Sequence, residues 1–392
     1  SITNNNLDLK GKKVLLRVDL NVPMKNGAIT ETSRIEKIIP TIKLLIKKEA
    51  KIIIMSHIGR PKGKVVKGMS LKPISEKLSL LLQKNVFFSE DLISENTLLE
   101  INKIPKGSIL MLENIRFNEG EETNDIKFSK KISALGDIYI NDAFSCSHRK
   151  QTSIHKITKY INSSYAGPQL MKEVEAIDKV LNQKKKPTTC IIGGSKISTK
   201  IGVIISLIKK IDYLIIVGAM ANNFIKFKGN EVGKSLIEED SYKVIKKIYD
   251  HAENHNCEIF TPLDFAVSET KEGNPNFRDL GSIKNNEIIL DVGPKTLKKI
   301  SKIIDMSKTI LWNGPAGYFE NINFSKGTTH IAEKISKNTN TTSLISIVGG
   351  GDTIAALKKN KLNLNFTHLS TAGGAFLEYI EGKNLPGIEV LK

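Results

Sequence analysis

Short apolar runs, each about the length of a β-strand, recur along the chain and end in small, polar or glycine residues. Eleven of them cover residues 14–18, 51–55, 86–88, 109–112, 138–141, 189–192, 214–217, 258–260, 288–291, 309–312 and 344–348. Nearly continuous apolar runs are typical of strands that are buried on both faces of a parallel sheet. We therefore expect parallel sheets built from these runs.

Helical patterns lie between the runs. Residues 33–48 carry apolar side chains at helical spacing, from Ile35 to Ile46. Residues 70–83 have a similar pattern, with Pro73 in the first turn, where proline is tolerated. A third helix is expected over residues 170–181. Alternating strands and helices predict an α/β fold.

The length of 392 residues favours two domains over one core. We expect the chain to divide between Tyr165 and Lys186, where the segment from Ala166 to Pro168 leads into the third helix. The halves show the same alternation of elements but no convincing sequence repeat. The predicted fold is α/β with two Rossmann-like domains, each a parallel sheet flanked by helices.

Composition narrows the class of protein. Hydrophobic residues make up 40% and charged residues 26%, which is typical of soluble globular proteins. We expect no membrane association and no signal peptide, because the apolar runs are strand-sized. Three widely spaced cysteines predict neither a disulfide framework nor a zinc site. A cytoplasmic protein is expected.

The formal net charge of +18 has two interpretations. Lysines could follow a nucleic-acid backbone, or they could be solvated surface residues that attract small anions. The lysines are spread along the chain, and aromatic residues make up only 6%, which argues against a base-stacking surface. The second interpretation is favoured, so no nucleic-acid partner is expected.

Polar side chains follow the strands of the first half. Open α/β sheets bind ligands outside the carboxyl ends of their strands. Arginines with polar neighbours in such positions form a bidentate site for an anion. The candidates are Asp19, Asn21, Arg34, His57, Arg60, Arg116, His148 and Arg149.

Glycine-rich joints follow the strands of the second half. Gly193 and Gly194 precede Lys196 and Lys200, and a strand followed by a helix start there favours phosphate binding. Residues 349–353 repeat this layout with three glycines, and Asp352 is a candidate ligand for Mg²⁺ or its waters. An ordinary helix cap at Asp352 or Thr353 is the alternative. Residues 371–375 form a third such joint.

Two other nucleotide-binding patterns are disfavoured. Residues 229–235 resemble a Walker A loop but have one residue too few between the glycines and follow a helical stretch. No GxGxxG follows the first strand, which disfavours a nicotinamide-dependent oxidoreductase.

The chain resembles the phosphoglycerate kinase family over essentially its whole length. The resemblance rests on RVDLNVP (17–23), SHIGRP (56–61), LENIRF (112–117), NDAF (141–144), GGSKISTK (193–200), DFAVS (264–268), DVGPKT (291–296), WNGPAGYFE (312–320), GGGDT (349–353) and STAGGAFLEYIEGKNLPG (370–387). It implies reversible phosphoryl transfer between 1,3-bisphosphoglycerate and ADP, in a cytoplasmic monomer that uses Mg²⁺ and has a deep cleft between its domains.

The resemblance also assigns domains and residues. It implies a triose-binding domain over 1–169, to which the tail 383–392 returns, and a nucleotide-binding domain over 170–382. The implied substrate contacts are Asp19, Asn21, Arg34, His57, Arg60, Arg116 and Arg149. The implied nucleotide contacts are Lys196, Lys200, Gly218, Asn313, Glu320 (ribose hydroxyls), Gly350, Gly351, Asp352 (beside Mg²⁺) and Thr353.

For catalysis, Arg34 and Lys200 are expected to be the main cationic groups, together with the backbone amides near Gly373 and Gly374. The chain departs from the family pattern at Ala372 and at Val217 and Ala219, where glycines are usual, and Lys150 adds a charge beside Arg149.

Overall fold

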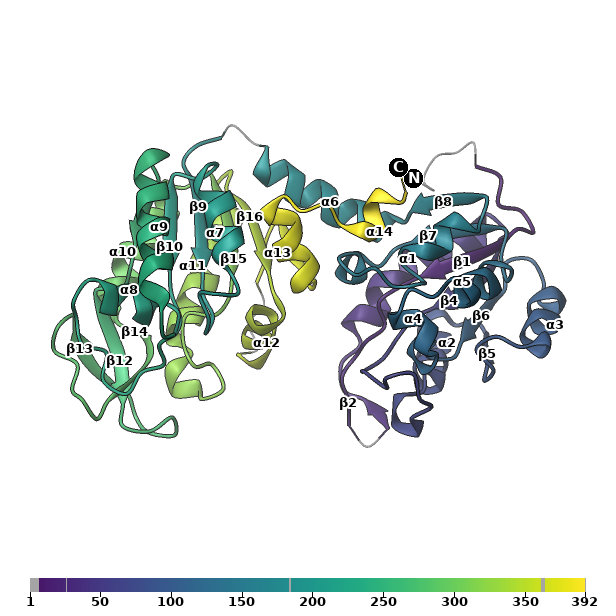
Figure 1. Ribbon diagram of the computed structural model, residues 1–392, viewed down its shortest axis with the longest axis horizontal. Coiled ribbons are helices and arrows are strands. Elements are labelled where there is room, and N and C mark those ends of the chain that lie inside the picture. The colour runs from purple at the N-terminus through teal and green to yellow at the C-terminus, as the bar shows by residue number, and fades with distance from the viewer. Residues whose placement is uncertain (1–6, 26, 183–184, 361–363, 392) are drawn as a thin grey trace. The chain divides into compact units, whose positions relative to one another are not determined.

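The computed structural model describes residues 7–25, 27–182, 185–360 and 364–391. The chain forms two compact units (Figure 1). Unit 1 comprises Ser1–Val174 and Asn384–Lys392, and unit 2 comprises Glu175–Lys383. The division falls within helix α6 (Pro168–Leu181).

Unit 1 is built on a six-stranded sheet in the order β5-β6-β4-β1-β7-β8, and all of its pairs are parallel. Its strands are β1 (Lys13–Arg17), β4 (Lys51–Met55), β5 (Val86–Ser89), β6 (Ile109–Leu112), β7 (Ile138–Asn141) and β8 (Ser163–Ala166). In the register of the central strands, Leu15 lies beside Ile53 on one side and Tyr139 on the other.

Alternate side chains of these strands enter two different cores, because successive residues of a strand point to opposite faces. On one face, Leu16 and Ile54 pack with α1 (Ser33–Lys47) and α2 (Lys72–Leu82). On the other face, Leu15 and Ile53 pack with α3 (Glu95–Lys103) and α5 (Ile126–Ser133). Burial on both faces explains why the strands are apolar throughout.

Unit 2 has a second six-stranded parallel sheet, in the order β11-β10-β9-β15-β16-β17. Its strands are β9 (Thr188–Ile192), β10 (Tyr213–Ile216), β11 (Glu258–Phe260), β15 (Thr309–Asn313), β16 (Ile345–Gly349) and β17 (His368–Ser370). Ile191 and Trp312 pack with α10 (Pro294–Met306) and α11 (Lys326–Thr341). Helix α7 (Ile201–Ile208) packs against α9 (Ser241–Asn254) and α13 (Gly374–Glu381).

The prediction for residues 288–291 is wrong in one respect. This run forms β14 (Ile288–Val292), which pairs antiparallel with β12 (Asp264–Ser268), not within a parallel sheet. Strand β13 (Asn276–Asp279) completes this small sheet. Its inner face packs on a separate core that includes Ile225 and Val232. An apolar run indicates burial but not strand direction, so the pattern could not distinguish the two cases.

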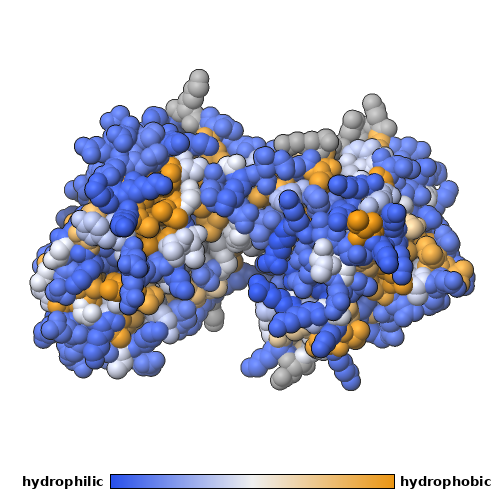
Figure 2. All heavy atoms as spheres, viewed as in Figure 1, coloured by the Kyte–Doolittle hydropathy of each residue, from blue (hydrophilic) through white to orange (hydrophobic). Residues whose placement is uncertain are grey.

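The two parallel sheets flanked by helices confirm the predicted fold class. The viewed surface is mostly hydrophilic, with scattered apolar patches (Figure 2). Among the residues that the structure describes, no helix combines the length and apolar character needed to cross a bilayer. The last residues of the chain belong to unit 1, where Asn141 donates a hydrogen bond to the carbonyl of Gly387 across 2.9 Å.

Candidate active-site residues in the two units

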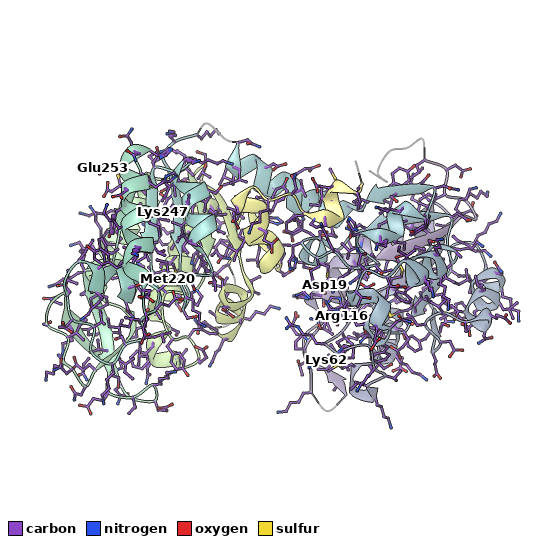
Figure 3. The ribbon with its side chains drawn as sticks, in the orientation of Figure 1. Asp19, Lys62, Arg116, Met220, Lys247 and Glu253 are labelled. Atoms are coloured by element: carbon purple, nitrogen blue, oxygen red, sulfur yellow. The ribbon has the colours of Figure 1, made fainter. Side chains whose placement is uncertain are left out.

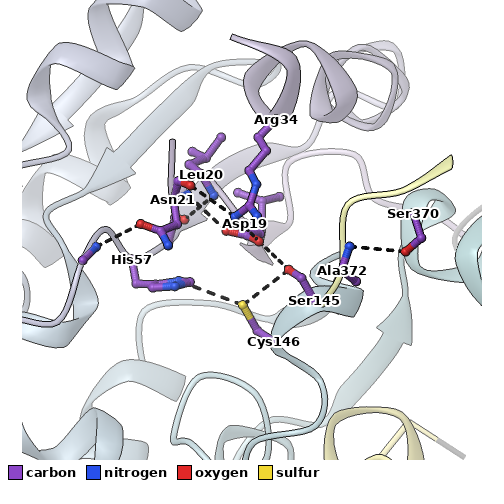
Figure 4. Close-up of polar contacts among 12 residues, drawn as sticks. Asp19, Leu20, Asn21, Arg34, His57, Ser145, Cys146, Ser370 and Ala372 are labelled. Carbon is purple, nitrogen blue, oxygen red and sulfur yellow. Dashed lines mark hydrogen bonds and ion pairs between the residues drawn. The ribbon is translucent and has the colours of Figure 1, made fainter. Parts of the chain in front are cut away.

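Unit 1 gathers charged side chains where β1, β4, β6 and β7 end. We call this group the cationic cluster; Asp19 and Arg116 are labelled in Figure 3, and Figure 4 shows the polar contacts around Asp19, Ser145 and Cys146. Its members are Arg17, Asp19, Asn21, Arg34, His57, Arg116, Ser145, Cys146 and Arg149. These strands are adjacent in the sheet, so segments far apart in sequence meet at its carboxyl edge.

Asp19 holds Arg34 in position. The Nη1 atom of Arg34 lies 2.7 Å from the carboxylate of Asp19 and also donates to the carbonyl of Asn21 across 3.2 Å. Ser145 donates a short hydrogen bond to the same carboxylate. Burial favours a higher pKa for Asp19, but the charge of Arg34, together with the hydrogen bonds from Ser145 and the backbone of Asn21, lowers that pKa to about 2. Asp19 is therefore a fixed anion that orients Arg34.

His57 is a buried, neutral imidazole. Its Nδ1 atom lies 3.1 Å from Nη2 of Arg17 and 4.0 Å from the sulfur of Cys146. Burial lowers the pKa of His57 well below its usual value, and the charges of Arg17 and Arg116 lower it further. Because Arg17 is a donor, Nδ1 acts as an acceptor and Nε2 carries the proton. His57 can therefore donate a hydrogen bond to an anion from Nε2.

The other expected residues differ in burial. Arg116 is almost completely buried, and its Nη1 atom donates to the carbonyl of Gly59 across 2.8 Å. Arg149 is half-buried beside His148, with 3.3 Å between Nε of Arg149 and Nε2 of His148. Arg60 follows Gly59 in the same turn, but its side chain is exposed.

Sequence reasoning missed Arg17, which is completely buried at the end of β1. Its Nε atom donates to the hydroxyl of Ser153 across 2.8 Å, and that hydroxyl donates to the carboxylate of Glu121 across 2.6 Å. Burial raises the pKa of Glu121. A charged residue inside the apolar run VLLRV was the available signal, because a buried charge requires partners.

Unit 2 contains a cavity of about 340 Å³ beside its glycine-rich strand ends. The lining is largely apolar, with contributions from Leu236, Phe265, Ile288 and Leu290, while Ser195, Lys271, Glu320 and Asp352 add polar groups. A mostly apolar cavity of this size with a few polar groups is typical of small-molecule sites.

Gly218 and Gly194 both border this cavity, and their backbones approach each other closely. The φ of Gly218 is +69°, and a Cβ atom there would come within 2.7 Å of the backbone nitrogen of Gly194. Met220, the next residue but one, donates its backbone N–H to the carbonyl of Gly194 across 2.9 Å (labelled in Figure 3). Glycine is thus required where the ends of β9 and β10 touch.

Lys200 and Asn313 connect the ends of β9 and β15. The Nζ atom of Lys200 donates to Oδ1 of Asn313 across 2.8 Å and to the carbonyl of Gly193. Asn313 in turn donates to the carbonyl of Gly349 across 2.9 Å, which adds the end of β16. Burial lowers the pKa of Lys200 to about 8, although the charge of Asp352 acts in the opposite direction.

The expected helix start at residues 193–200 is wrong in detail. Helix α7 begins at Ile201, and Lys200 is its N-cap, so Lys196 lies in the preceding loop with an exposed side chain. The backbone N–H of Ser198 bonds to the carboxylate of Glu238 across 3.0 Å instead of remaining available to an anion. That contact between distant segments outweighs local helix propensity.

The glycine joint after β16 has the expected layout. Helix α12 (Gly351–Lys359) has Gly350 as its N-cap, with a φ of +106°. Thr353 accepts a hydrogen bond from the backbone N–H of Gly314 across 2.8 Å. Asp352 is exposed in the first turn of α12 and borders the cavity. An exposed carboxylate beside a helix N-terminus fits Mg²⁺ carried by phosphate oxygens, because Mg²⁺ prefers oxygen ligands.

The remaining expected residues lie in the same unit. Glu320 borders the cavity, and its carbonyl accepts a hydrogen bond from Lys359. Gly373 is the N-cap of α13, and Gly374 is its first residue. At the positions that depart from the family pattern, Ala372 is buried without a positive φ, Val217 belongs to the core, and Ala219 borders the cavity.

A model of the family described as phosphoglycerate kinase matches residues 4–383. The chain belongs to the phosphoglycerate kinase family. Phosphoglycerate kinase from Rhizobium meliloti is 44% identical over 387 residues, which cover 98% of this chain and 97% of that protein. Phosphoglycerate kinase from Rhodopseudomonas palustris is 45% identical over 392 residues, covering 100% of this chain and 98% of that protein.

Solved structures of the family have the same fold. The structure of phosphoglycerate kinase from Coxiella burnetii has a TM-score of 0.88 and 40% identity, with coverage of 99% of this chain and 98% of that chain. That from Pyrococcus horikoshii has a TM-score of 0.84 and 29% identity, with the same coverage. The chain is thus a phosphotransferase of glycolysis that catalyses reversible phosphoryl transfer between 1,3-bisphosphoglycerate and ADP, giving 3-phosphoglycerate and ATP.

Proposed function

We propose that each unit binds one of the two substrates. The cationic cluster of unit 1 binds 3-phosphoglycerate, and the cavity of unit 2 binds the nucleotide with Mg²⁺. The contrast between the two sites carries the proposal: arginines and His57 converge in unit 1, whereas unit 2 joins an apolar cavity to glycine-rich helix starts. The site in unit 1 suits a small, highly charged anion, and the site in unit 2 suits a nucleotide base that carries a phosphate chain.

In unit 1, Arg34, Arg116 and Arg149 supply positive charge for the phosphate and carboxylate of the triose. Asp19 and Asn21 orient Arg34, and Asn21 also accepts a hydrogen bond from the backbone of Gly59 across 3.0 Å. His57 donates from Nε2. Arg60 is assigned to the same substrate from its place in the Gly59 turn.

In unit 2, the base enters the apolar part of the cavity and Glu320 binds the ribose hydroxyls. Lys196, Lys200 and the backbone of residues 350–353 bind the phosphates, and Gly218 and Asn313 shape the site. Asp352 holds Mg²⁺ or its waters. When bound, Mg²⁺ neutralises charge on the phosphate oxygens and helps to align them.

The transfer itself needs no strong general base. The carboxylate of 3-phosphoglycerate is already ionised and attacks the terminal phosphorus of ATP in line with the departing ADP oxygen. Arg34, Lys200 and the backbone amides near Gly373 and Gly374 stabilise negative charge on the moving phosphoryl group. Because the substrates are assigned to different units, we propose that the units close before transfer and thereby exclude water.

The assignment of one substrate to each unit is tested by calorimetric titrations. Arg34→Ala should weaken binding of 3-phosphoglycerate and leave MgADP binding unchanged, and Lys200→Ala should do the reverse. A variant that weakens only the other substrate would refute the assignment. We further propose that the protein is cytoplasmic, which the three buried free cysteines support. We also propose that it is a monomer, and light scattering of the purified protein tests its mass.

A further inference from the structure

We propose that Asp291 is a positioning residue for the nucleotide, and that its ionised carboxylate holds one wall of the cavity in the binding-competent form. The inference rests on the proposed placement of the nucleotide in unit 2 and assigns a role to a residue outside the expected site. Asp291 lies on β14, borders the cavity and is 3% exposed.

The carboxylate of Asp291 joins segments that are separate in sequence. One oxygen accepts the backbone N–H of Val292 across 2.8 Å, and the other accepts the backbone N–H of Gly327 across 2.8 Å. Gly327 is in the first turn of α11, whose N-cap residue makes no side-chain cap of its own. Asp291 therefore caps α11 from β14, and the helix dipole favours the ionised form.

The same carboxylate packs against the cavity wall. A Cβ atom on Gly317 would come within 2.5 Å of Oδ1 of Asp291, so the Gly317 turn lies directly on this side chain. That turn leads into Tyr318, Phe319 and Glu320, all of which border the cavity. A change at Asp291 is thus transmitted to the segment that carries the proposed ribose ligand.

Protonation changes what Asp291 can accept. The ionised carboxylate accepts both N–H groups, whereas a protonated carboxyl has a hydroxyl in place of one acceptor. Burial raises the pKa of Asp291 to about 7, while Gly327, Val292 and the nearby charge of Lys326 act in the opposite direction. The wall is therefore expected to loosen locally as the pH falls below 7, with the protonated carboxyl group still buried.

The test uses two matched variants. Asp291→Asn keeps the shape of the side chain but presents an N–H₂ group to one of the two donors. Asp264→Asn is the control, because Asp264 is another buried carboxylate that caps a helix, accepting the backbone N–H groups of Lys295 and Thr296 at the start of α10. Asp264 is absent from the cavity lining.

The measurement is the Kd of MgADP by calorimetry at pH 6, 7 and 8. We expect wild-type binding to weaken roughly five- to tenfold towards pH 6, as for the loss of one hydrogen bond. Asp291→Asn should be weakened by a similar factor at pH 8 and should change less with pH. Asp264→Asn leaves Asp291 and the other residues of the cavity unchanged, so it should follow the wild type. Equal pH dependence in all three proteins would overturn the role of Asp291.

A third variant separates this inference from the proposed function. Ala219→Leu fills the cavity from a different strand end and should weaken MgADP binding at every pH. If Ala219→Leu binds normally, the nucleotide does not occupy the cavity, and both proposals fall. If it binds weakly while Asp291→Asn binds normally, only the role of Asp291 is wrong.

A measurement on the wild type remains decisive even if Asp291→Asn does not fold. Amide hydrogen exchange of residues 316–328, corrected for the intrinsic effect of pH, should be faster at pH 6 than at pH 8. Unchanged protection of this segment would contradict the inference.

Discussion

The ammonium group of Lys200 donates a hydrogen bond to the side-chain oxygen of Asn313, with 2.8 Å between the two atoms. This contact places a lysine that is hidden from most solvent beside the glycine joints of three neighbouring strands. The ammonium group of Lys200 is therefore already held in position and partly removed from water before any anion binds. Its charge should therefore stabilise the negative charge of a bound phosphate more strongly than the charge of a surface lysine would.

Lys200→Ala is expected to lower kcat by about 10²–10³-fold, the effect of removing one pre-positioned donor to a developing charge. The coupled assay with 3-phosphoglycerate and MgATP measures this loss. Lys228→Ala is the matched control, since Lys228 is also hydrogen-bonded, across 2.9 Å to Thr261, and also has its pKa lowered by desolvation, but does not border the cavity. Similar losses in both variants would mean that Lys200 has no special role.

The pH profile of the reaction should show a decline on the alkaline side. Burial lowers the pKa of Lys200 to about 8, so the free enzyme loses this charge as the pH rises through 8. Because kcat/KM reports ionisations of the free enzyme, kcat/KM for MgADP should fall above pH 8. Arginine remains charged there, so Lys200→Arg should be less active overall but lack this decline. An unchanged profile in Lys200→Arg would assign the decline to another group.

Arg34→Met should act mainly on the triose, with a smaller cost to stability. Arg34 is partly exposed, so solvent screens part of its attraction to Asp19, although Asp19 is largely buried and loses its main counter-charge. The lost contact to an anionic substrate should raise the KM for 3-phosphoglycerate by about tenfold or more, as for a charge-assisted hydrogen bond. Steady-state kinetics measures the change.

The control for Arg34 is Arg278→Met. Arg278 is 26% exposed, against 27% for Arg34, and forms an ion pair with Glu287 across the same 2.7 Å, but it belongs to β13 in unit 2. Loss of triose affinity in this variant too would indicate a general charge effect.

Arg17→Met should destabilise the fold by about 3–5 kcal/mol, because it leaves Glu121 as an uncompensated buried charge. Urea unfolding measures the loss. The double variant Arg17→Met with Glu121→Gln should regain part of it, since the orphaned charge is then absent. Simple additivity of the two single changes would show that the residues are not coupled.

Stability should also depend on Asp291. Its folded-state pKa, about 7, lies above the ordinary 3.8, so between these values the folded protein binds more protons than the unfolded chain. The free energy of unfolding should accordingly decrease as the pH rises from about 4 to 7. Asp291→Asn removes this contribution, and thermal unfolding over that range tests the difference. The ionised form that the nucleotide site uses is thus the form that burial disfavours.

Much of the architecture could be predicted from the sequence, and for a clear physical reason. Strands covered on both faces must be apolar throughout, and parallel strands place their carboxyl ends at one edge. Asp19, His57 and Arg116 follow three such strands, so their convergence follows from the fold. The glycine joint at Gly350 could be recognised in the same way.

Other features depend on contacts between distant segments. The antiparallel pairing of β14 with β12 is decided by a small separate core, and the late start of α7 by Glu238. The capping of α11 by Asp291 joins residues that are separated by thirty-six positions. Local patterns contain no information on such pairings. Arg17 was also missed, but in its case a local signal existed, because a charged residue stands inside the apolar run VLLRV.

The attachment of residues 384–391 to unit 1 has a consequence for biosynthesis. Gly387 donates its backbone N–H to the carbonyl of Ser147 across 2.8 Å, and a Cβ atom on Gly387 would come within 2.5 Å of a methyl carbon of Ile154. On the ribosome, all of unit 2 is translated between the two portions of unit 1. The earlier portion of unit 1 must therefore wait for residues 384–391 before its native contacts are complete.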